Sequence, residues 1–312
     1  MSRHRRPKHK SGFVSLLGRP NSGKSTLLNA LLGTKLAIVA DKPQTTRTTI
    51  QGVLTLDGAQ VVFLDTPGIH DPDNVFNRRM MQSLGEAVTD RDLILYLADA
   101  TRPVNTEDGK ALEWVKKSGA PAFLLLNKVD LVKDKKALLP LLARYQELYD
   151  FAEYFPISAL TREGLDGLMQ AILARLPEGP AYFPPDHLTD QPERFLAAEL
   201  IREQILAQTR QEVPHSVAVL VDEWIEEGHL LRISATVHVE RPGQKAIILG
   251  TKAARLKAIG TAARKEIEAL LGHKVFLTLF VKVSAHWREN EGFLKELDPR
   301  AMTGAPSHNE SE

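Results

Sequence analysis

The chain has 312 residues, of which 43% are hydrophobic and 25% are charged, and it contains no cysteine. This composition is typical of a globular protein, and it excludes disulfides, thiolate catalysis and cysteine-based zinc sites. The formal net charge of +1 hides a local contrast: residues 181–240 carry 4 basic and 11 acidic side chains, whereas residues 241–290 carry 10 basic and 3 acidic ones. The basic stretch predicts an anionic partner.

The first 176 residues are predicted to alternate between strands and helices, after a basic tail at residues 1–11. Expected strands lie at residues 13–18, on either side of the hairpin turn 57–58, and at 93–100, 120–130 and 155–158. Expected helices follow residue 23, with Leu27, Leu28, Leu31 and Leu32 on one face, and lie at 106–117, 135–149 and 165–176. This alternation favours a mostly parallel, doubly wound α/β sheet.

The composition changes at residues 177–192, which hold five of the 18 prolines. Proline at that density predicts a stiff linker between two domains. Beyond it the pattern predicts a helix at 193–209, strands at 216–225 and 230–240, two helices up to about 271, and a strand at 274–283. This α-β-β-α-α-β order indicates a smaller α+β domain at residues 193–290, followed by a C-terminal tail at 291–312.

A phosphate-binding loop is predicted at "GRPNSGKST", Gly18 to Thr26, which matches the pattern G-x-x-x-x-G-K-S/T between a strand and a helix. The glycines let backbone N–H groups wrap phosphates, and the helix N-terminus adds a positive dipole. We expect Lys24 to reach the β- and γ-phosphates and the Ser25 hydroxyl to bind Mg²⁺. The loop residues expected to hold nucleotide are Gly18, Asn21, Ser22, Gly23, Lys24, Ser25 and Thr26.

The base is predicted to be guanine, from "NKVD" at Asn127, Lys128 and Asp130. The Asp130 carboxylate can accept hydrogen bonds from the N1–H and the exocyclic amine of guanine, whereas adenine offers an acceptor at N1. The motif alone is common, but it lies at the C-terminal end of the strand expected at 120–130, where open α/β sheets bind ligands, and the phosphate loop lies upstream. A second base contact is expected from a backbone N–H of "SAL", Ser158, Ala159 and Leu160.

Two further segments predict the γ-phosphate and metal contacts. In "DTPG", Asp65 is expected to hold a Mg²⁺-bound water, and the N–H of Gly68 to meet the γ-phosphate. In "PQTTR", one threonine is expected to complete the Mg²⁺ coordination; Thr46 is favoured and Thr45 is the alternative. The predicted catalytic residues are therefore Lys24, Thr46 and Gly68, and the predicted metal ligands are Ser25, Thr46 and, through water, Asp65.

Together these motifs resemble the Era family of bacterial ribosome-assembly GTPases over about residues 12–288. The resemblance implies a P-loop GTPase domain at 12–176 that binds GTP, GDP and Mg²⁺. Ile69 stands where many GTPases have a glutamine that orients water, and Era proteins similarly lack it, so slow intrinsic hydrolysis is expected. Asn21 matches a position that holds K⁺ in related GTPases; the alternative, that Asn21 only shapes the loop, stays open.

The basic region at "AIILGTKAARLKAIG" resembles the loop between two helices of a bacterial KH domain, where a GXXG sequence clamps RNA backbone. Here Gly250, Thr251, Lys252 and Ala253 occupy that loop. Ala253 replaces the second glycine and is expected to open the next helix with a negative φ. The alternative is a plain solvated basic helix. The residues expected to bind RNA are Lys245, Gly250, Thr251, Lys252, Ala253, Arg255 and Lys257.

The resemblance implies a GTPase switch that binds 16S ribosomal RNA and acts in small-subunit assembly. Such a protein would be monomeric and cytoplasmic, which suits the absence of cysteine and of any apolar run long enough to span a membrane. The alternative is a signalling GTPase at the membrane surface, whose basic amphipathic helix after residue 252 binds proteins or anionic lipid. A P-loop kinase is disfavoured by "NKVD".

Overall fold

The computed structural model describes residues 9–42, 44–69, 73–209, 213 and 216–302. It divides into two compact units, one formed by residues up to 73 and 77–190, and the other by residues 74–76 and those from 191 onward. Each unit is described by itself below.

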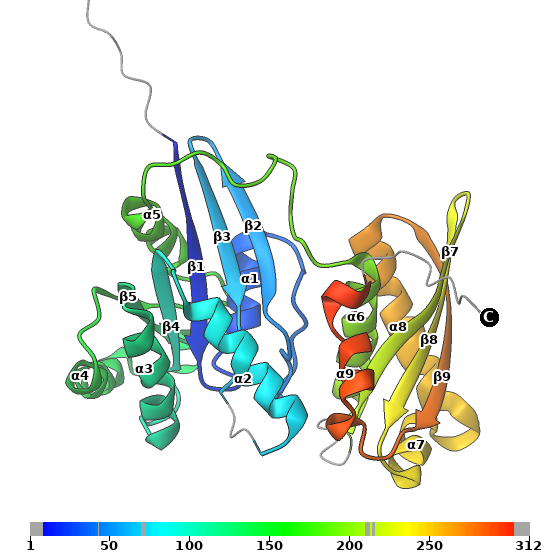
Figure 1. The fold of residues 1–312 in the computed structure, drawn as a ribbon. Coiled ribbons are helices and arrows are strands. Elements are labelled where there is room, and N and C mark those ends of the chain that lie inside the picture. Colours follow the sequence, from blue (N-terminus) through cyan, green and yellow to red (C-terminus); the bar gives the residue numbers. More distant parts are fainter. Residues whose placement is uncertain (1–8, 43, 70–72, 210–212, 214–215, 303–312) are drawn as a thin grey trace, which may run out of the picture. The chain divides into compact units, whose positions relative to one another are not determined.

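The first unit is a six-stranded sheet with helices on it (Figure 1). Its strands are β1 (Lys10–Gly18), β2 (Ile50–Leu56), β3 (Ala59–Asp65), β4 (Leu93–Asp99), β5 (Ala122–Asn127) and β6 (Glu153–Pro156). Their order is β2-β3-β1-β4-β5-β6, and only β2 is antiparallel to its neighbour. Its helices are α1 (Lys24–Leu32), α2 (Val75–Val88), α3 (Thr106–Ser118), α4 (Leu138–Leu148) and α5 (Leu165–Arg175). The predicted α/β class is confirmed.

Strands β3, β4 and β5 are buried along their whole length, as expected for strands covered on both faces. Helices α2, α3 and α4 contribute to one apolar cluster with β4 and β5. Helix α2 is absent from the elements predicted above. Its buried side chains Phe76, Met80 and Leu84 recur every four residues, which is a helical spacing. Charged and polar residues lie between them and make this pattern less visible in the sequence.

The proline-rich segment, predicted to be a stiff linker between the two domains, instead packs largely on the first unit. Up to residue 190 it belongs to the first unit, because its backbone bonds to the edge of the sheet. The N–H of Gly179 donates to His9, and the N–H of Val53 donates to Leu188 (2.8 Å). The Gln60 side chain accepts from Phe183 N (2.9 Å). Proline stops regular structure, but its neighbours keep donors and acceptors that can bond to a strand. The expected N-terminal tail is also shorter, since β1 begins at Lys10; residues 1–8 lie outside the described ones.

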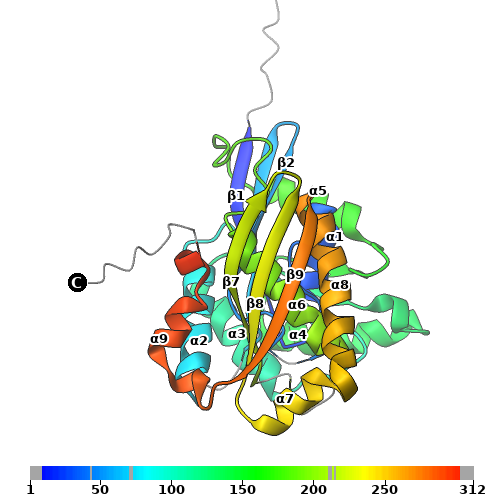
Figure 2. The same ribbon diagram turned by 90° about the vertical axis from the view of Figure 1, so that its right-hand side faces the viewer.

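The second unit is a three-stranded sheet in the order β7-β8-β9 with helices packed on one face (Figure 2). Its elements are α6 (Glu193–Gln208), β7 (Ala218–Glu227), β8 (Leu230–Val239), α7 (Pro242–Leu249), α8 (Ala254–Leu271), β9 (Lys274–Val283) and α9 (Glu291–Glu296). Strands β7 and β8 pair antiparallel, and β8 and β9 pair parallel. The order up to β9 is the predicted α-β-β-α-α-β.

Helix α9 lies in the segment that was expected to be a tail. Its Phe293 ring contacts the rings of His238 (centroids 4.7 Å apart) and Trp287 (5.7 Å). Apolar packing therefore orders the chain at least to the end of this helix; residues 303–312 lie outside the described ones.

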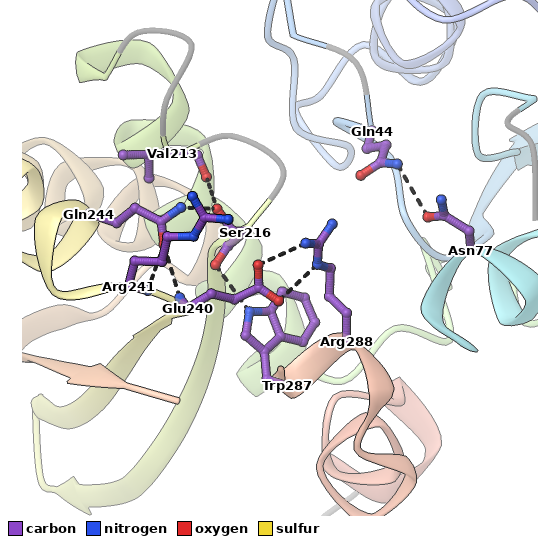
Figure 3. A network of polar contacts seen from close by, with 9 residues as sticks. All are labelled: Gln44, Asn77, Val213, Ser216, Glu240, Arg241, Gln244, Trp287 and Arg288. Atoms are coloured by element: carbon purple, nitrogen blue, oxygen red, sulfur yellow. Dashed lines mark hydrogen bonds and ion pairs between the residues drawn. The ribbon is translucent and has the colours of Figure 1, made fainter. Parts of the chain in front are cut away.

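A polar network fastens the start of α7 to the segment after β9 (Figure 3). The buried Trp287 donates its indole N–H to the carbonyl of Ser216 (3.0 Å), and Gln244 donates to the Ser216 hydroxyl (2.6 Å). Arg288 donates twice to the Glu240 carboxylate, at 3.0 and 2.7 Å. These bonds hold the helix pair α7–α8 at a fixed place on the sheet.

Candidate functional site

The phosphate loop joins the end of β1 to the start of α1. Gly18 and Gly23 have φ values of 149° and 100°, which favour glycine. A Cβ on Gly18 would lie 2.3 Å from the carbonyl oxygen of Leu97, and one on Gly23 would lie 2.2 Å from Nδ2 of Asn127. Both positions therefore need glycine for space as well as for conformation. The loop residues Asn21, Gly23, Lys24, Ser25 and Thr26 line one pocket.

Lys24 and Ser22 lie inside this loop. The Lys24 ammonium donates to the carbonyls of Gly18 (3.1 Å) and Arg19 (3.0 Å). Burial lowers the pKa of Lys24 to about 8, and the charge of Asp65 opposes that shift. The Ser22 hydroxyl is buried and has no hydrogen-bond partner within the described part of the chain. A buried cation and an unpartnered hydroxyl are what a phosphate group would satisfy.

Three oxygen-bearing side chains converge beside Lys24. Ser25 Oγ lies 2.6 Å from Asp65 Oδ2 and 2.8 Å from Thr46 Oγ1, and Thr46 lies 3.2 Å from the same carboxylate oxygen. The other oxygen of Asp65 is buried and has no hydrogen-bond partner among the described residues. Burial raises the pKa of Asp65, and Lys24 opposes the shift. Hard oxygen donors with a spare carboxylate oxygen fit Mg²⁺.

The geometry distinguishes the two candidate threonines. Thr45 donates its hydroxyl to the carbonyls of Lys42 (2.6 Å) and Ala40 (3.2 Å), so it shapes the turn before Thr46. In the same segment Gln44 donates to Asn77 of α2 at 3.2 Å (Figure 3). Only Thr46 reaches the cluster of Ser25 and Asp65.

The "NKVD" motif begins at Asn127, the last residue of β5, and continues into the turn after it. Asn127 is buried and bridges two loops: its amide donates to Ser22 O (2.8 Å) and accepts from Ala159 N (2.9 Å). Lys128 has a φ of 67° and pairs with Asp99 (2.8 Å). Asp130 is exposed and makes no hydrogen bond or ion pair with the described residues. Its carboxylate is therefore available to a ligand, whereas the Ala159 N–H already has a protein acceptor.

The other two residues of "SAL" are Ser158 and Leu160. The buried Ser158 accepts from Thr161 N at 3.1 Å through its hydroxyl. Leu160 is 77% exposed. The backbone N–H that donates to a base carbonyl, expected from Ser158, Ala159 or Leu160, therefore stays a prediction.

One pocket collects seven of the fifteen residues predicted to bind nucleotide; Asp130 and the "SAL" residues are not among its lining. It is lined by Pro20, Asn21, Gly23, Lys24, Ser25, Thr26, Ile38 to Lys42, Gln44, Thr45, Thr46, Gly68 and Lys128. Gly68 is buried against Pro20, whose Cγ would lie 2.9 Å from an added Cβ. Ile69 instead packs against the apolar cluster of the sheet. The structure therefore gives Ile69 a packing contact and leaves the Gly68 backbone at the pocket.

The loop between α7 and α8 carries the candidate RNA contacts. Gly250 has φ 68° and ψ −179°, and an added Cβ would lie 2.9 Å from Cβ of Arg255. This position therefore requires glycine. Thr251, Lys252, Ala253, Arg255 and Lys257 are exposed, and Gly250 and Lys245 are half-buried.

One expectation about this loop is wrong. Ala253 was predicted to have a negative φ as the first residue of the helix; instead it precedes α8 with φ 58°, and Lys252 has φ 50°. The prediction was wrong because two consecutive residues, Lys252 and Ala253, adopt the left-handed backbone conformation before the helix begins. Arg255, predicted as a phosphate contact, donates to the carbonyl of Ile247 at 2.5 Å and so braces the end of α7.

Comparisons with known proteins agree with both units. Residues 13–128 match the 50S ribosome-binding GTPase family, and residues 212–288 match the KH domain family. The chain is 50% identical to GTPase Era of Syntrophus aciditrophicus over 92% of its length and 94% of that protein. It is 51% identical to GTPase Era of Geobacter metallireducens over 92% of its length and 97% of that protein.

Two solved structures are similar over both units. The structure of Aquifex aeolicus Era bound to GDP·AlF4⁻ has a TM-score of 0.89, and that of Era in complex with MgGDPNP and nucleotides 1506–1542 of 16S ribosomal RNA has a TM-score of 0.90. Each is 39% identical and covers 93% of this chain and 99% of its own. The predicted family and GTPase activity are thereby confirmed, and the chain belongs to the Era family of GTPases.

Proposed function

We propose that this GTPase uses GTP to control its binding to 16S ribosomal RNA during assembly of the small ribosomal subunit. The observation that carries the proposal is the convergence of Ser25, Thr46 and Asp65 beside the phosphate loop. In the same chain, the second unit has an exposed basic loop between α7 and α8. The similar Era structure that contains MgGDPNP and a 16S fragment supports the pairing of these two ligands.

In this proposal the phosphate loop holds GTP or GDP. Backbone N–H groups from Asn21 to Thr26 surround the phosphates, and Lys24 and the Ser22 hydroxyl donate to their oxygens. Asp130, exposed two residues after the pocket-lining Lys128, accepts from the N1–H and amine of guanine. Asn127 holds the phosphate loop and the "SAL" loop beside each other, because its side-chain amide bonds to Ser22 and to Ala159.

The residues fit Mg²⁺ as the accompanying cation. Ser25 and Thr46 would hold it through their hydroxyls, and Asp65 through a water. When bound, Mg²⁺ neutralises negative charge on the β- and γ-phosphates. Thr46 lines the pocket together with residues 38–42, 44 and 45 of the same segment. This segment would therefore close on the triphosphate and release after hydrolysis, which supplies the switch.

Hydrolysis relies on backbone and cations rather than on a side chain at position 69. The Gly68 N–H donates to the γ-phosphate, and Lys24 stabilises charge on the same group. The aliphatic Ile69 packs on the core, so intrinsic turnover is slow. Asn21 lines the pocket and would help to hold a K⁺ ion, which would supply the charge that an arginine finger supplies in other GTPases.

The second unit clamps single-stranded RNA through Gly250, Thr251, Lys252 and Ala253. The exposed loop lets a phosphate backbone approach closely, and Lys245 and Lys257 add positive charge. The chain acts as a monomer in the cytoplasm.

A membrane-surface role is the second candidate. No helix in the described part of the chain is both long enough and apolar enough to cross a bilayer. A peripheral contact would instead use the basic residues of α8 on anionic lipid. Flotation with vesicles containing phosphatidylglycerol measures this contact directly.

The RNA proposal is tested with Thr251→Asp combined with Lys252→Asp. We expect single-stranded RNA binding to be abolished, because two carboxylates would face the phosphates, while GTP affinity stays at the wild-type value. Lys295→Asp, an exposed change on α9, is the control for added negative charge. Wild-type RNA affinity with an unchanged salt dependence in the loop variant would overturn the proposal, and flotation without RNA binding would favour the membrane role.

A further inference from the structure

The three-stranded sheet of the second unit has one covered and one open face. Along β8 every second residue from Leu231 to Val239 is buried, on the side where α6 and α8 pack. The alternate residues of β8 and their partners in β7 and β9 point to the other face, which Figure 2 shows toward the viewer. Helix α9 covers only the end of that face at His238, through Phe293.

The open face carries two exposed aromatic rings on β9. Phe276 is 53% and Phe280 56% exposed, and they are the two phenylalanines among the exposed large hydrophobic side chains of the described residues. They share one face because they are four residues apart on a strand, with Thr278 between them. Their Cα atoms lie about 13 Å apart at the usual rise of a strand, so no single planar group contacts both rings.

Positive charge surrounds these rings. Lys274 and Lys282 lie on the same face of β9 as the two rings, because each is two residues from one of them. Lys274 precedes Phe276, and Lys282 follows Phe280. Arg232, opposite Phe276 in the β8–β9 register, places its guanidinium 5.4 Å from the ring centroid. The neighbouring outward residues of β8 are hydroxyl-bearing, Ser234 and Thr236.

Acidic side chains of this face lie on the far strand β7, where Asp222 accepts from the Thr236 hydroxyl (2.7 Å), and Glu268 of α8 pairs with Lys274 (3.8 Å). Glu223 and Glu227 lie on β7, and Glu227 pairs with Arg232 at 2.7 Å, where both side chains are about half exposed. The face therefore has a basic and aromatic track along β9 and β8, bounded by an acidic edge. We call the residues Lys274, Phe276, Phe280, Lys282 and Arg232 the β9 track.

This chemistry fits single-stranded RNA better than a protein. Separate aromatic rings on an open sheet stack bases, and flanking cations contact the phosphates between them. A stable protein interface needs a continuous apolar centre, whereas the two rings here are separated by a threonine. The acidic edge at β7 would repel the RNA backbone and so confine it to the track.

We propose that the β9 track is a second surface for single-stranded RNA, separate from the loop Gly250–Ala253. Phe276 and Phe280 each stack one base, and Lys274 and Lys282 contact phosphates at the two ends. The inference rests on the proposed RNA-binding function and extends it from a short clamp to a longer bound segment.

The test replaces both rings. Binding of a fluorescein-labelled 12-nucleotide single-stranded RNA is measured by anisotropy for Phe276→Ala combined with Phe280→Ala. We expect affinity to fall about 25-fold or more, since each stacked base contributes about fivefold at the lower limit. The double Phe→Tyr variant keeps the rings and is expected to bind as the wild type. Ile225→Ala, an exposed apolar change on β7 of the same sheet, is the matched control.

The outcomes separate this inference from the function on which it rests. If the double alanine variant binds like the wild type while the Thr251→Asp, Lys252→Asp variant fails to bind, the β9 track is wrong and the loop clamp stands. If neither variant changes affinity, both are wrong. The double Phe→Leu variant keeps apolar surface without a π-face, so wild-type RNA affinity in that variant would point to apolar docking and overturn the stacking role. Phe280→Trp supplies a direct readout, since RNA stacking on the indole is expected to quench its fluorescence.

Discussion

Arg19 of the phosphate loop forms a buried ion pair with Asp108 of α3, with Nη1 and Oδ2 3.3 Å apart. The other Asp108 oxygen accepts from the hydroxyls of Tyr96 and Tyr145, each at 2.9 Å. Burial first, and then the Asp108 charge, raise the pKa of both tyrosines, so both stay protonated donors. The carbonyl of Arg19 in turn accepts from Lys24. A chain of polar contacts thus links α3 to the lysine expected at the phosphates.

Removing Asp108 is expected to damage both stability and nucleotide binding. Asp108→Ala leaves the Arg19 charge buried without its partner, which costs about 3–5 kcal/mol of unfolding free energy. Urea unfolding and the GTP dissociation constant measure the two effects. The double change Tyr96→Phe and Tyr145→Phe, which keeps the ion pair, is expected to cost about 1 kcal/mol per lost hydrogen bond. An Asp108→Ala protein with wild-type stability would show that Arg19 finds another partner.

Asp130 is expected to set guanine specificity. Asp130→Asn should weaken GTP binding and improve binding of xanthosine triphosphate, because xanthine has a carbonyl where guanine has its amine, and an amide can donate to it. Competition binding with both nucleotides measures the exchange. Since Asp130 is exposed and bonds to no described residue, stability is expected to stay within about 0.5 kcal/mol of the wild type. An unchanged GTP preference would contradict the assignment.

Lys24 and Ile69 are expected to differ sharply in hydrolysis. Lys24→Ala should abolish phosphate release, since the lysine stabilises charge on the transferred group. Ile69→Ala should leave the turnover number within about threefold, which is under 1 kcal/mol of barrier. Because Ile69 packs on the core, thermal melting accompanies the assay to separate a loss of folded protein from a loss of rate. A hundredfold loss in folded Ile69→Ala would give this residue a catalytic role.

The identity of the monovalent cation is expected to alter turnover. If Asn21 holds K⁺, replacing KCl with NaCl at equal ionic strength should slow GTP hydrolysis in the wild type. Asn21→Ala should remove that difference, because the ion then lacks its side-chain ligand. Equal wild-type rates in the two salts would leave Asn21 as a residue that shapes the loop, consistent with its φ of 62°.

Ala253→Gly is expected to stabilise the second unit. Ala253 has φ 58°, where a Cβ costs about 1 kcal/mol relative to glycine, so the melting temperature should rise. This follows from the correction above, since Ala253 was expected to open the helix with a negative φ. RNA affinity should equal or exceed that of the wild type, because the substitution removes a methyl group from the clamp. Weaker RNA binding by a folded variant would show that the methyl contacts RNA.

Local sequence determined the chemistry of the nucleotide site. The phosphate loop, "NKVD" and "DTPG" are short segments in which neighbouring residues share a role, and each follows a strand whose apolar run is visible. Since the carboxyl ends of parallel strands meet at one edge of a sheet, their convergence could be expected before the structure was known. The same holds for the order of elements in the second unit, which follows from periodicity.

The tertiary structure decided what depends on residues far apart in the chain. The choice of Thr46 over Thr45 required the distances to Ser25 and Asp65, and the partner of Arg19 lies 89 positions away in α3. The proline-rich segment bonds to a strand edge that its composition does not identify. The positive φ of Ala253 follows a second left-handed residue, Lys252, a pair that the sequence pattern does not predict. Side-chain and backbone geometry of this kind is fixed by packing, which no local pattern encodes.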